Sequence, residues 1–318
     1  MKIIRNIKDI TGKYKNPCVT IGNFDGVHLG HQRLFEVVQQ NARRVGGTSI
    51  VITFDPHPLQ VLKPGGIKLI STIEQKIELI ELSGMDVLIV VPFDLKFAGT
   101  TAESFVDEIL LRRIGVKDLF VGYDYAFGKG RAGNIDFLRK QGEEKGFSVT
   151  VIDAYYENDT IVSSTKIREL VAEGRMMDTS RLLGRYYQIR GKVQRGKQRG
   201  SKEIGYPTAN LHISEEDLVP RTGVYVCQVI YDDVCYGGVI NIGYNPTFGE
   251  KTLVAETHIF DFDHNIYGKP IKVNLLKFLR GEVKFTSIRE LSEQIAKDVL
   301  SAREVLDVAV KDEQRFVW

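Results

Sequence analysis

The feature that most constrains the fold is an alternation of two kinds of segment over roughly the first 160 residues. Short runs of apolar and β-branched residues are separated by longer stretches whose apolar residues recur at helical spacing. Such a pattern predicts strands buried on both faces and a parallel, doubly wound α/β sheet. The predicted strands are 17–24, 48–54, 86–93, 117–125 and 147–156, and the predicted helices are 31–47, 73–84, 101–115 and 134–146.

The pattern changes near residue 184. From there on, short strand-like runs are separated by turn residues, which predicts an antiparallel barrel or sandwich followed by one amphipathic helix that begins at Thr286 or Ser287. We therefore expect an α/β domain at 1–184 and a β domain at 185–318. The predicted strands of the second domain are 186–193, 223–233, 234–243, 253–262 and 271–280, and its helix is 287–306.

The composition excludes several classes of protein. A net charge of +2 gives no overall attraction to nucleic acid or membranes, and three cysteines without a CxxC pair disfavour a disulfide scaffold or a zinc site. The N-terminus lacks an apolar signal core, and no uncharged apolar run reaches membrane-spanning length. We expect a cytoplasmic protein with no nucleic-acid or membrane partner, and the sequence identifies no protein partner.

The stretch VTIGNFDGVHLGHQRLF, residues 19–35, joins a strand to a helix through glycines and two histidines. Helix N-termini bind anions through unpaired N–H groups, and imidazoles can donate to phosphate oxygens. One alternative is a metal site on His28 and His31 with Asp25 or His57 as third ligand. A second alternative is a plain helix-capping turn. The candidate phosphate-binding residues are Gly22, Asn23, Phe24, His28, Gly30 and His31.

A second anion-binding candidate is IVSSTKIREL, residues 161–170. Ser163, Ser164 and Thr165 stand at a predicted helix start, followed by Lys166 and Arg168. The helix dipole disfavours cations at this end, and a bound polyanion would remove that conflict. The alternative is an ordinary Ser/Thr cap.

A glycine motif offers a competing interpretation. GKGRAG, residues 128–133, matches GxGxxG between a predicted strand and a predicted helix, with Asp153 twenty residues after its last glycine. This pattern is typical of a dinucleotide-binding dehydrogenase. Such an enzyme would leave the two histidines and the SSTKIR segment unexplained.

The second domain carries a basic, glycine-containing stretch, IRGKVQRGKQRGSKEIGYPTANL, residues 189–211. It could be a solvated hairpin, an RNA-binding patch on a barrel, or a loop that folds over a ligand. The side-chain oxygens of Thr208 and Asn210 suit a hard cation such as Mg²⁺. Glu256, in the strand-like AETHIF, is either an outward-facing residue or a general base for a substrate hydroxyl.

The first-half motifs together resemble a known family. GNFDGVHLGHQ, TFDPHP, VGYDYAFGKGRAGN and SSTKIR occur in the order of the adenylyltransferase module of bacterial bifunctional riboflavin kinase/FAD synthetases, over residues 17–170. The resemblance implies that the histidines and the segment Ser163 to Arg168 contact ATP phosphates without a metal. Tyr125 stands where phenylalanine is usual. The implied flavin and nucleotide contacts are Phe54, Pro56, His57, Pro58, Asp124, Phe127 and Gly128.

The second half resembles the riboflavin kinase module of the same family. RGKQRGSKEIGYPTANL, NIGYNPTF, ETHIFDFDHNIYGKPIKV and FLRGEVKF follow its order. The resemblance implies a six-stranded barrel, Glu256 as general base, and Arg280 and Phe285 near the flavin. Tyr206 stands where phenylalanine or isoleucine is frequent. The implied ATP contacts are Gly196, Gly200, Lys202, Pro207, Thr208 and Asn210, of which Thr208 and Asn210 also bind Mg²⁺.

The resemblance thus implies a bifunctional enzyme of flavin cofactor synthesis. The C-terminal module would phosphorylate riboflavin to FMN with ATP and Mg²⁺. The N-terminal module would adenylylate FMN to FAD and release pyrophosphate. Its ligands would be riboflavin, FMN and ATP.

Overall fold

A computed structural model of the chain describes residues 1–10, 14–63, 65–195, 205–247 and 250–311. These residues form two compact units, Met1–Ser164 and Thr165–Trp318. The predicted domain boundary after residue 184 lies further along the chain, at the end of a helix, and it stays a prediction.

The first unit is built on a six-stranded sheet in which every neighbouring pair of strands is parallel, in the order β1-β4-β3-β2-β5-β6. The three central strands are buried almost throughout, which confirms the prediction made from their uninterrupted apolar runs. The short β1 was not predicted. The strands are β1 Lys2–Ile4, β2 Pro17–Ile21, β3 Thr48–Asp55, β4 Val87–Pro92, β5 Asp118–Gly122 and β6 Ser148–Ile152.

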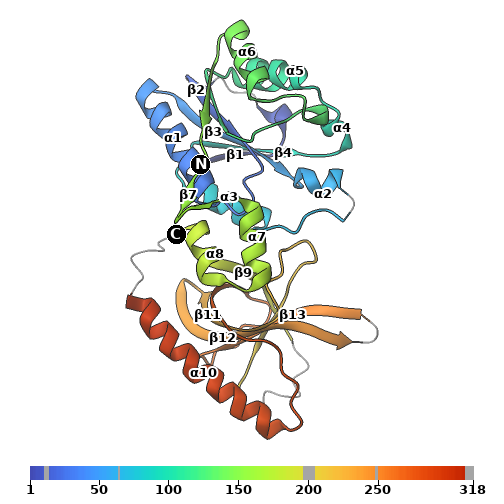
Figure 1. Cartoon of the computed structure of the whole chain (residues 1–318), viewed down its shortest axis with the longest axis vertical. Coiled ribbons are helices and arrows are strands. Elements are labelled where there is room, and N and C mark those ends of the chain that lie inside the picture. Colours follow the sequence, from blue (N-terminus) through green and yellow to red (C-terminus); the bar gives the residue numbers. More distant parts are fainter. Residues whose placement is uncertain (11–13, 64, 196–204, 248–249, 312–318) are drawn as a thin grey trace. The chain divides into compact units, whose positions relative to one another are not determined.

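Helices cover both faces of this sheet (Figure 1). On one face α1 (Leu29–Val45) and α3 (Ile73–Leu82) pack Phe35 and Ile80 against the strands. The other face carries Leu110 and Leu138 from the helices η2 and α6. The sheet is therefore doubly wound, as predicted. The remaining elements are η1 Ile7–Asp9, α2 Pro58–Leu62, α4 Leu95–Ala98, α5 Ala102–Ser104, η2 Phe105–Ile114, η3 Lys129–Arg131, α6 Ile135–Lys145, β7 Tyr156–Glu157 and β8 Thr160–Ile161.

The second unit is a closed, antiparallel barrel in the order β10-β13-β12-β11-β14-β9. All five strands predicted for this region are present, and β10 completes the barrel. The strands are β9 Tyr187–Gln194, β10 Ala209–His212, β11 Gly223–Tyr231, β12 Val234–Thr247, β13 Glu250–Ile259 and β14 Pro270–Arg280. Two helices, α7 (Ser164–Glu173) and α8 (Met176–Leu183), precede the barrel, and α8 packs on β9 and β14.

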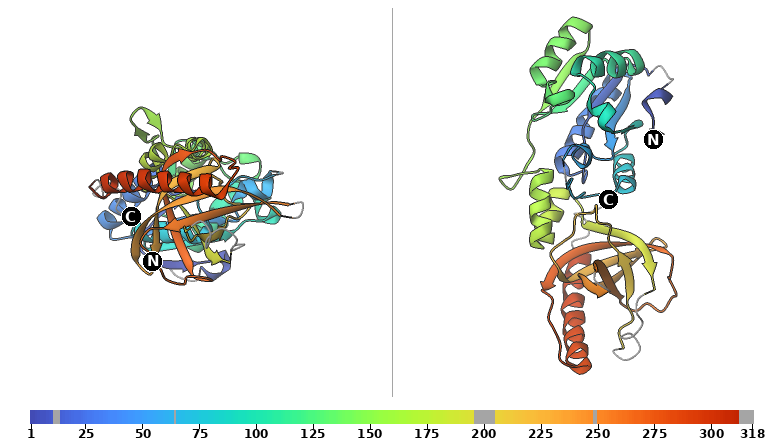
Figure 2. Two further views of the ribbon diagram at one scale, coloured as in Figure 1. Left: turned by 90° about the horizontal axis from the view of Figure 1, so that it is seen from below. Right: turned by 90° about the vertical axis from the view of Figure 1, so that its right-hand side faces the viewer.

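The predicted C-terminal helix, α10 (Ile288–Lys311), lies along the outer face of the barrel over β11 and β12 (Figure 2). Its residues Ala302 and Leu306 join a cluster with outward-facing apolar side chains of the strands. A β-carbon at Gly237 would lie 2.7 Å from Leu306, so this glycine allows close approach of the helix. The helix start uses both predicted capping residues, since Thr286 hydrogen-bonds the Glu290 carboxylate and Ser287 Oγ accepts from the Glu290 N–H.

Candidate functional site

The loop between β2 and α1, residues 22–28, is held in an unusual backbone conformation. Phe24 and Val27 have positive φ angles of 48° and 39°, as does Gly26 at 78°. A β-branched residue such as Val27 rarely adopts this conformation, and strained backbone of this kind gathers at functional sites. The loop leaves the carboxyl end of a central strand, where ligands of doubly wound sheets bind.

The side chain of Asp25 fixes this loop to the segment before α3. Its buried carboxylate accepts hydrogen bonds from the N–H groups of Ile70 and Ser71 at 3.1 and 3.2 Å. Ser71 Oγ in turn accepts from the N–H of Gly26 at 3.0 Å. Asp25 is thus committed to shaping the loop, and His57 is committed to capping α2, because its Nδ1 accepts from the Leu59 N–H at 3.1 Å. Both candidates for the third ligand of a metal site therefore have other roles.

The two histidines lie together at the start of α1. His28 is the N-cap residue, and its Nδ1 accepts from the His31 N–H at 3.4 Å. The two rings stack with centroids 3.5 Å apart, and the His31 and Phe24 rings are perpendicular, with their centroids 5.1 Å apart. Gly30 adds no side chain beside the His28 ring, since a β-carbon at this position would lie only 3.3 Å from that ring. The described part of the chain brings together no group of three His, Cys, Asp or Glu side chains that could hold a metal ion.

The start of the SSTKIR segment meets this loop. Ser164 Oγ donates a hydrogen bond to the Asp25 carbonyl at 3.1 Å, and the Val162 carbonyl lies 3.6 Å from the position of a Gly30 β-carbon. The two candidate phosphate-binding segments, far apart in sequence, are thus side by side at Ser163 and Ser164. Thr165 and Arg168 follow along α7, which starts at Ser164 as predicted.

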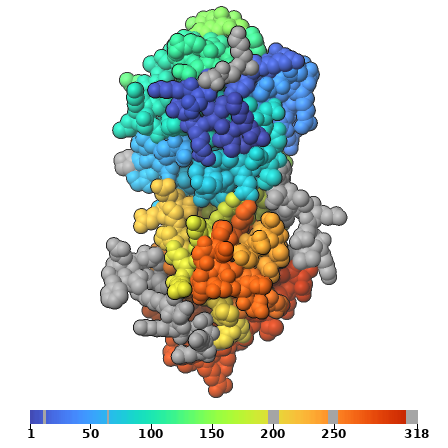
Figure 3. Space-filling view, turned by 180° about the vertical axis from the view of Figure 1, so that it is seen from behind, coloured from blue at the N-terminus to red at the C-terminus, as the bar shows by residue number. Residues whose placement is uncertain are grey.

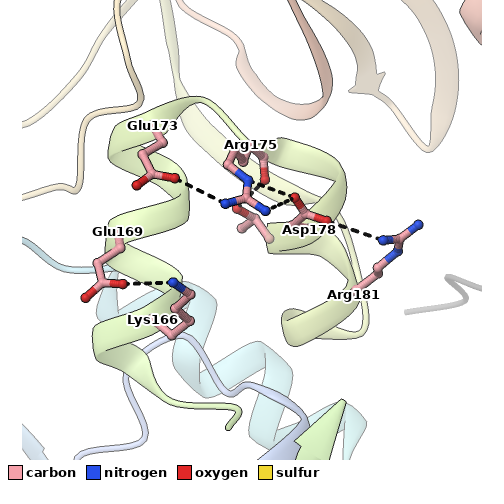
Figure 4. A network of polar contacts seen from close by, with 7 residues as sticks. Lys166, Glu169, Glu173, Arg175, Asp178 and Arg181 are labelled. Carbon is pink, nitrogen blue, oxygen red and sulfur yellow. Dashed lines mark hydrogen bonds and ion pairs between the residues drawn. The ribbon is translucent and has the colours of Figure 1, made fainter. Parts of the chain in front are cut away.

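Lys166, at the start of α7, and Arg175, directly before α8, have acidic neighbours. Lys166 Nζ lies 3.1 Å from Glu169, and Arg175 bridges Glu173 and Asp178 (Figure 4). These pairs are largely exposed and screened by solvent, so they contribute little to stability. The pairing of Lys166 with Glu169 nevertheless means that this lysine alone does not require a bound polyanion.

A line of aromatic rings connects the two predicted flavin-contact segments. Phe54, at the end of β3, lies 6.1 Å from Phe97, which lies 6.4 Å from Phe105. Phe105 in turn contacts Phe127 at 5.3 Å. Phe93, 5.7 Å from both Phe54 and Phe97, belongs to the same cluster. The sequence interpretation missed Phe93 and Phe97. Phe93 directly follows β4, at the edge of the sheet where ligands bind, and Phe97 lies on α4, the next helix.

The other predicted contacts of this unit lie on the same two loops. Pro56 and His57 follow β3 directly, and Pro58 is the first residue of α2. Asp124 is exposed in the loop after β5. Tyr125 stacks on Phe127 at 5.6 Å, and burial raises the pKa of its phenol.

Lys76, which the sequence interpretation also missed, is a buried cation close to the loops that follow β2 and β3. Its ammonium donates to the Phe54 carbonyl at 3.4 Å, and it is attracted by Asp25 and Asp55. Burial lowers the pKa of Lys76, and the two carboxylates oppose that shift. Its place three residues after Ile73 and four before Ile80, on the apolar stripe of α3, was the available signal.

The GKGRAG loop does not have the geometry of a dinucleotide fingerprint. Its first glycine, Gly128, packs so closely on Ala102 that a β-carbon would lie 2.8 Å from the Ala102 nitrogen. Lys129 N–H donates to the Thr100 carbonyl at 2.9 Å. The following helix is capped by Asn134 after the last glycine, so no glycine of the motif forms the helix start that holds a pyrophosphate.

In the second unit, three polar side chains form a row across the outer face of the barrel. Asn210 of β10 is directly opposite Glu256 of β13, which is directly opposite Asn241 of β12. Partners in antiparallel register project to the same face, about 5 Å apart. Burial raises the pKa of Glu256, which makes its carboxylate a stronger base. No hydrogen bond joins these three side chains to any described residue.

The segment before β10 is fixed beside this row. His258 Nδ1 lies 2.9 Å from the Pro207 carbonyl, so in this pair the ring nitrogen donates, and the edge of the His258 ring contacts Tyr206 at 5.2 Å. Asn210 is in register with Glu256, and Thr208 stands two residues earlier, directly before the start of β10. The predicted contacts Gly196, Gly200 and Lys202 lie outside the described residues.

Arg280, predicted to lie near the flavin, is bound to α10. Its guanidinium makes a bidentate pair with Asp298, with distances of 2.8 to 3.1 Å. Its Cζ lies 5.8 Å from the ring of Phe285, also a predicted flavin contact. The pair joins the end of β14 to the helix and so fixes both ends of the segment 281–287.

A strained loop at the carboxyl edge of a doubly wound sheet, joined in one chain to a barrel with a carboxylate between two amides, is the arrangement expected of a two-module phosphate-transfer enzyme. Residues 11–166 match the family described as FAD synthetase, and residues 183–306 match the riboflavin kinase family. The chain belongs to the family of bifunctional riboflavin kinase/FMN adenylyltransferases.

Relatives of that name match almost the whole chain. The Escherichia coli K12 protein is 36% identical over 96% of this chain and 97% of its own length. The Bacillus subtilis protein is 39% identical over 88% of this chain and 89% of its own. A crystal structure of a macrolide-efflux protein from Streptococcus pneumoniae, 30% identical, superposes with a TM-score of 0.85 over 95% of this chain and 98% of that one.

These findings confirm the predicted fold, family and enzyme class, and the dehydrogenase interpretation of GKGRAG is wrong. None of the described helices is both long and apolar enough to cross a membrane. The roles of individual site residues stay predictions.

Proposed function

We propose that the two candidate sites divide the two reactions of the family between the units. The barrel phosphorylates riboflavin to FMN, and the α/β unit adenylylates FMN to FAD. Two contacts carry this assignment, one within each unit. The Ser164–Asp25 hydrogen bond joins two phosphate-binding segments in the first unit, and Glu256 lies between two amides in the second.

In adenylylation, an oxygen of the FMN phosphate attacks the α-phosphorus of ATP, and the bond to pyrophosphate breaks. The nucleophile is already ionised at neutral pH, so the site needs charge stabilisation rather than a strong base. His28 and His31 at the helix start and the hydroxyls of Ser163 and Ser164 are the proposed donors to the phosphate oxygens. The aromatic line that includes Phe54 and Phe127 is proposed as the wall for the flavin ring. The roles of Thr165 and Arg168, which belong to the second unit, stay predictions.

In phosphorylation, the 5′-hydroxyl of riboflavin attacks the γ-phosphorus of ATP, the bond to ADP breaks, and Glu256 takes the hydroxyl proton. Positioning and charge stabilisation dominate such reactions. The raised pKa of the half-buried Glu256 suits proton acceptance. Phe285 and the Arg280 end of β14 are proposed to border the flavin.

The residues beside Glu256 fit a magnesium ion. The Asn210 amide offers a neutral oxygen directly opposite the Glu256 carboxylate, and the Thr208 hydroxyl, two residues earlier in the chain, offers another. Mg²⁺ prefers few protein oxygens completed by waters and substrate phosphates. When bound, such an ion neutralises charge on the phosphates being transferred. A cytoplasmic location and the absence of nucleic-acid partners stay predictions.

Incubation with riboflavin, ATP and Mg²⁺, followed by chromatography for FMN and FAD, tests this proposal. The wild type should form both products. His28→Ala should accumulate FMN and form FAD at least about a hundredfold more slowly, as expected for loss of an electrostatic donor. An unchanged rate of FAD formation in this variant would remove the phosphate-binding role of the histidine.

A further inference from the structure

We infer that Asn241, with Glu282 beside it, recognises the secondary hydroxyls of the polyhydroxylated chain of the alcohol substrate. This inference rests on the proposed kinase function of the barrel. Asn241 lies in NIGYNPTF and Glu282 in FLRGEVKF, but the sequence assigned neither residue a role. Asn241 is placed by the register of the barrel and Glu282 by the segment after β14.

The row across the outer face has a direction. Asn210, on the proposed side for Mg²⁺ and the phosphates of ATP, lies on one side of Glu256, and Asn241 lies on the other. The attacking hydroxyl oxygen must reach the γ-phosphorus and give its proton to Glu256 at the same time, so it lies within reach of both. With the phosphates on the Asn210 side of the carboxylate, the rest of the alcohol chain extends toward Asn241.

Gly243, two residues further along the same face of β12, forms the floor of this side. A β-carbon at Gly243 would overlap the carboxylate of Glu282, and it would lie 3.8 Å from the Asn241 amide nitrogen. The carboxylate and the amide thus flank one point above a residue that has no side chain. Glu282 reaches this point from the segment after β14 and is exposed to solvent. Figure 3 shows side chains of the barrel strands, in orange, at the surface of the molecule.

The polar groups here are available to a ligand. The Asn241 and Glu282 side chains make no hydrogen bond to any described residue. Amides elsewhere on the barrel behave differently: Asn274 accepts from Gln188 at 2.7 Å and donates to Gln228 at 3.5 Å. An amide supplies donors and an acceptor, and a carboxylate supplies acceptors, which together match the alternating donors and acceptors of a polyol.

A comparison of two substrates tests the contact directly. One is riboflavin, and the other is the flavin whose N10 chain is 5-hydroxypentyl, which keeps the reacting terminal hydroxyl and lacks the three secondary ones. Asn241→Ala should raise KM for riboflavin roughly 2- to 12-fold, the loss of one hydrogen bond, with kcat changed less than about twofold. The same variant should leave KM for the hydroxypentyl flavin at its wild-type value. Dissociation constants from flavin fluorescence quenching give the same comparison without turnover.

Two further variants complete the design. Glu282→Gln changes an exposed side chain, so it keeps the test valid if Asn241→Ala fails to fold, and it should show the same dependence on substrate. Asn274→Ala is the matched control and should leave KM unchanged for both flavins. Equal effects of Asn241→Ala and Glu282→Gln on the two flavins, or a loss confined to kcat, would overturn the inference. A wild type that makes no FMN would instead refute the proposed function.

Discussion

At the scale of single residues, Glu256 carries the sharpest test of the division of labour. Its carboxylate has the raised pKa of a group that is costly to ionise where it lies. Glu256→Gln keeps the shape and removes the proton acceptor, so riboflavin phosphorylation should fall about 10²- to 10⁴-fold, as measured by FMN formation. Supplied FMN should still be converted to FAD at the wild-type rate. Parallel loss of both activities in a folded variant would contradict separate sites.

Lys76 tests whether a buried charge holds the loops of the first unit. Lys76→Met removes the cation that contacts the Phe54 carbonyl and attracts Asp25 and Asp55, so FAD formation should fall at least about tenfold while FMN formation is unchanged. Lys145, which pairs with Asp107 on the far helices, is the matched control, and Lys145→Met should preserve both rates. If the Lys76 and Lys145 variants behave alike, the anchoring role is wrong.

The same lysine predicts a pH dependence of stability. Burial holds its folded pKa below the unfolded value of 10.5, so between these two values the unfolded chain binds more protons. The contribution of Lys76 to stability is therefore lost as pH falls through the folded pKa and regained as pH rises toward 10.5. Urea denaturation of wild type and Lys76→Met at a series of pH values should show the wild type gaining relative stability with rising pH. The opposite slope would mean that the carboxylates outweigh burial.

At the scale of elements, local pattern was sufficient and long-range register was not. The apolar runs predicted β2 to β6 within a few residues, and they predicted a helix after the two histidines. That His28 itself caps α1 was not predicted. Nothing local places Asn241 opposite Glu256, since that neighbourhood depends on how β12 and β13 pair. Lys76 and Phe97 were missed although both had a local signal: Lys76 stands on the apolar stripe of α3, and Phe97 lies on the short helix that follows β4. The family resemblance supplied Glu256, whereas the residue pattern alone left it ambiguous.

The loop between β2 and α1 makes a prediction at this scale. Gly26 has φ = 78°, and a β-carbon there would lie 2.7 Å from Ile70, so Gly26→Ala combines backbone strain of about 1–2 kcal/mol with overpacking of about 1–3 kcal/mol. Gly146 has the same φ of 78° and open space around it, so Gly146→Ala should cost only the strain. Chemical denaturation and FAD formation should both be affected more by the change at Gly26. Equal costs at the two glycines would show that the contact with Ile70 yields freely.

At the scale of the whole molecule, the question is where the kinase module begins. The predicted boundary after residue 184 removes α8, yet Met176, Leu182 and Leu183 of this helix are buried, and α8 packs on β9 and β14. A fragment of residues 165–318 should therefore melt at a higher temperature than one of residues 185–318, because burying one such side chain contributes about 1.5–3 kcal/mol. Both fragments should phosphorylate riboflavin and neither should form FAD, since Glu256 and its row are retained and the strained loop is absent. Equal melting temperatures would place the boundary after Gly184, and a 165–318 fragment unable to make FMN would show that the barrel depends on the first unit.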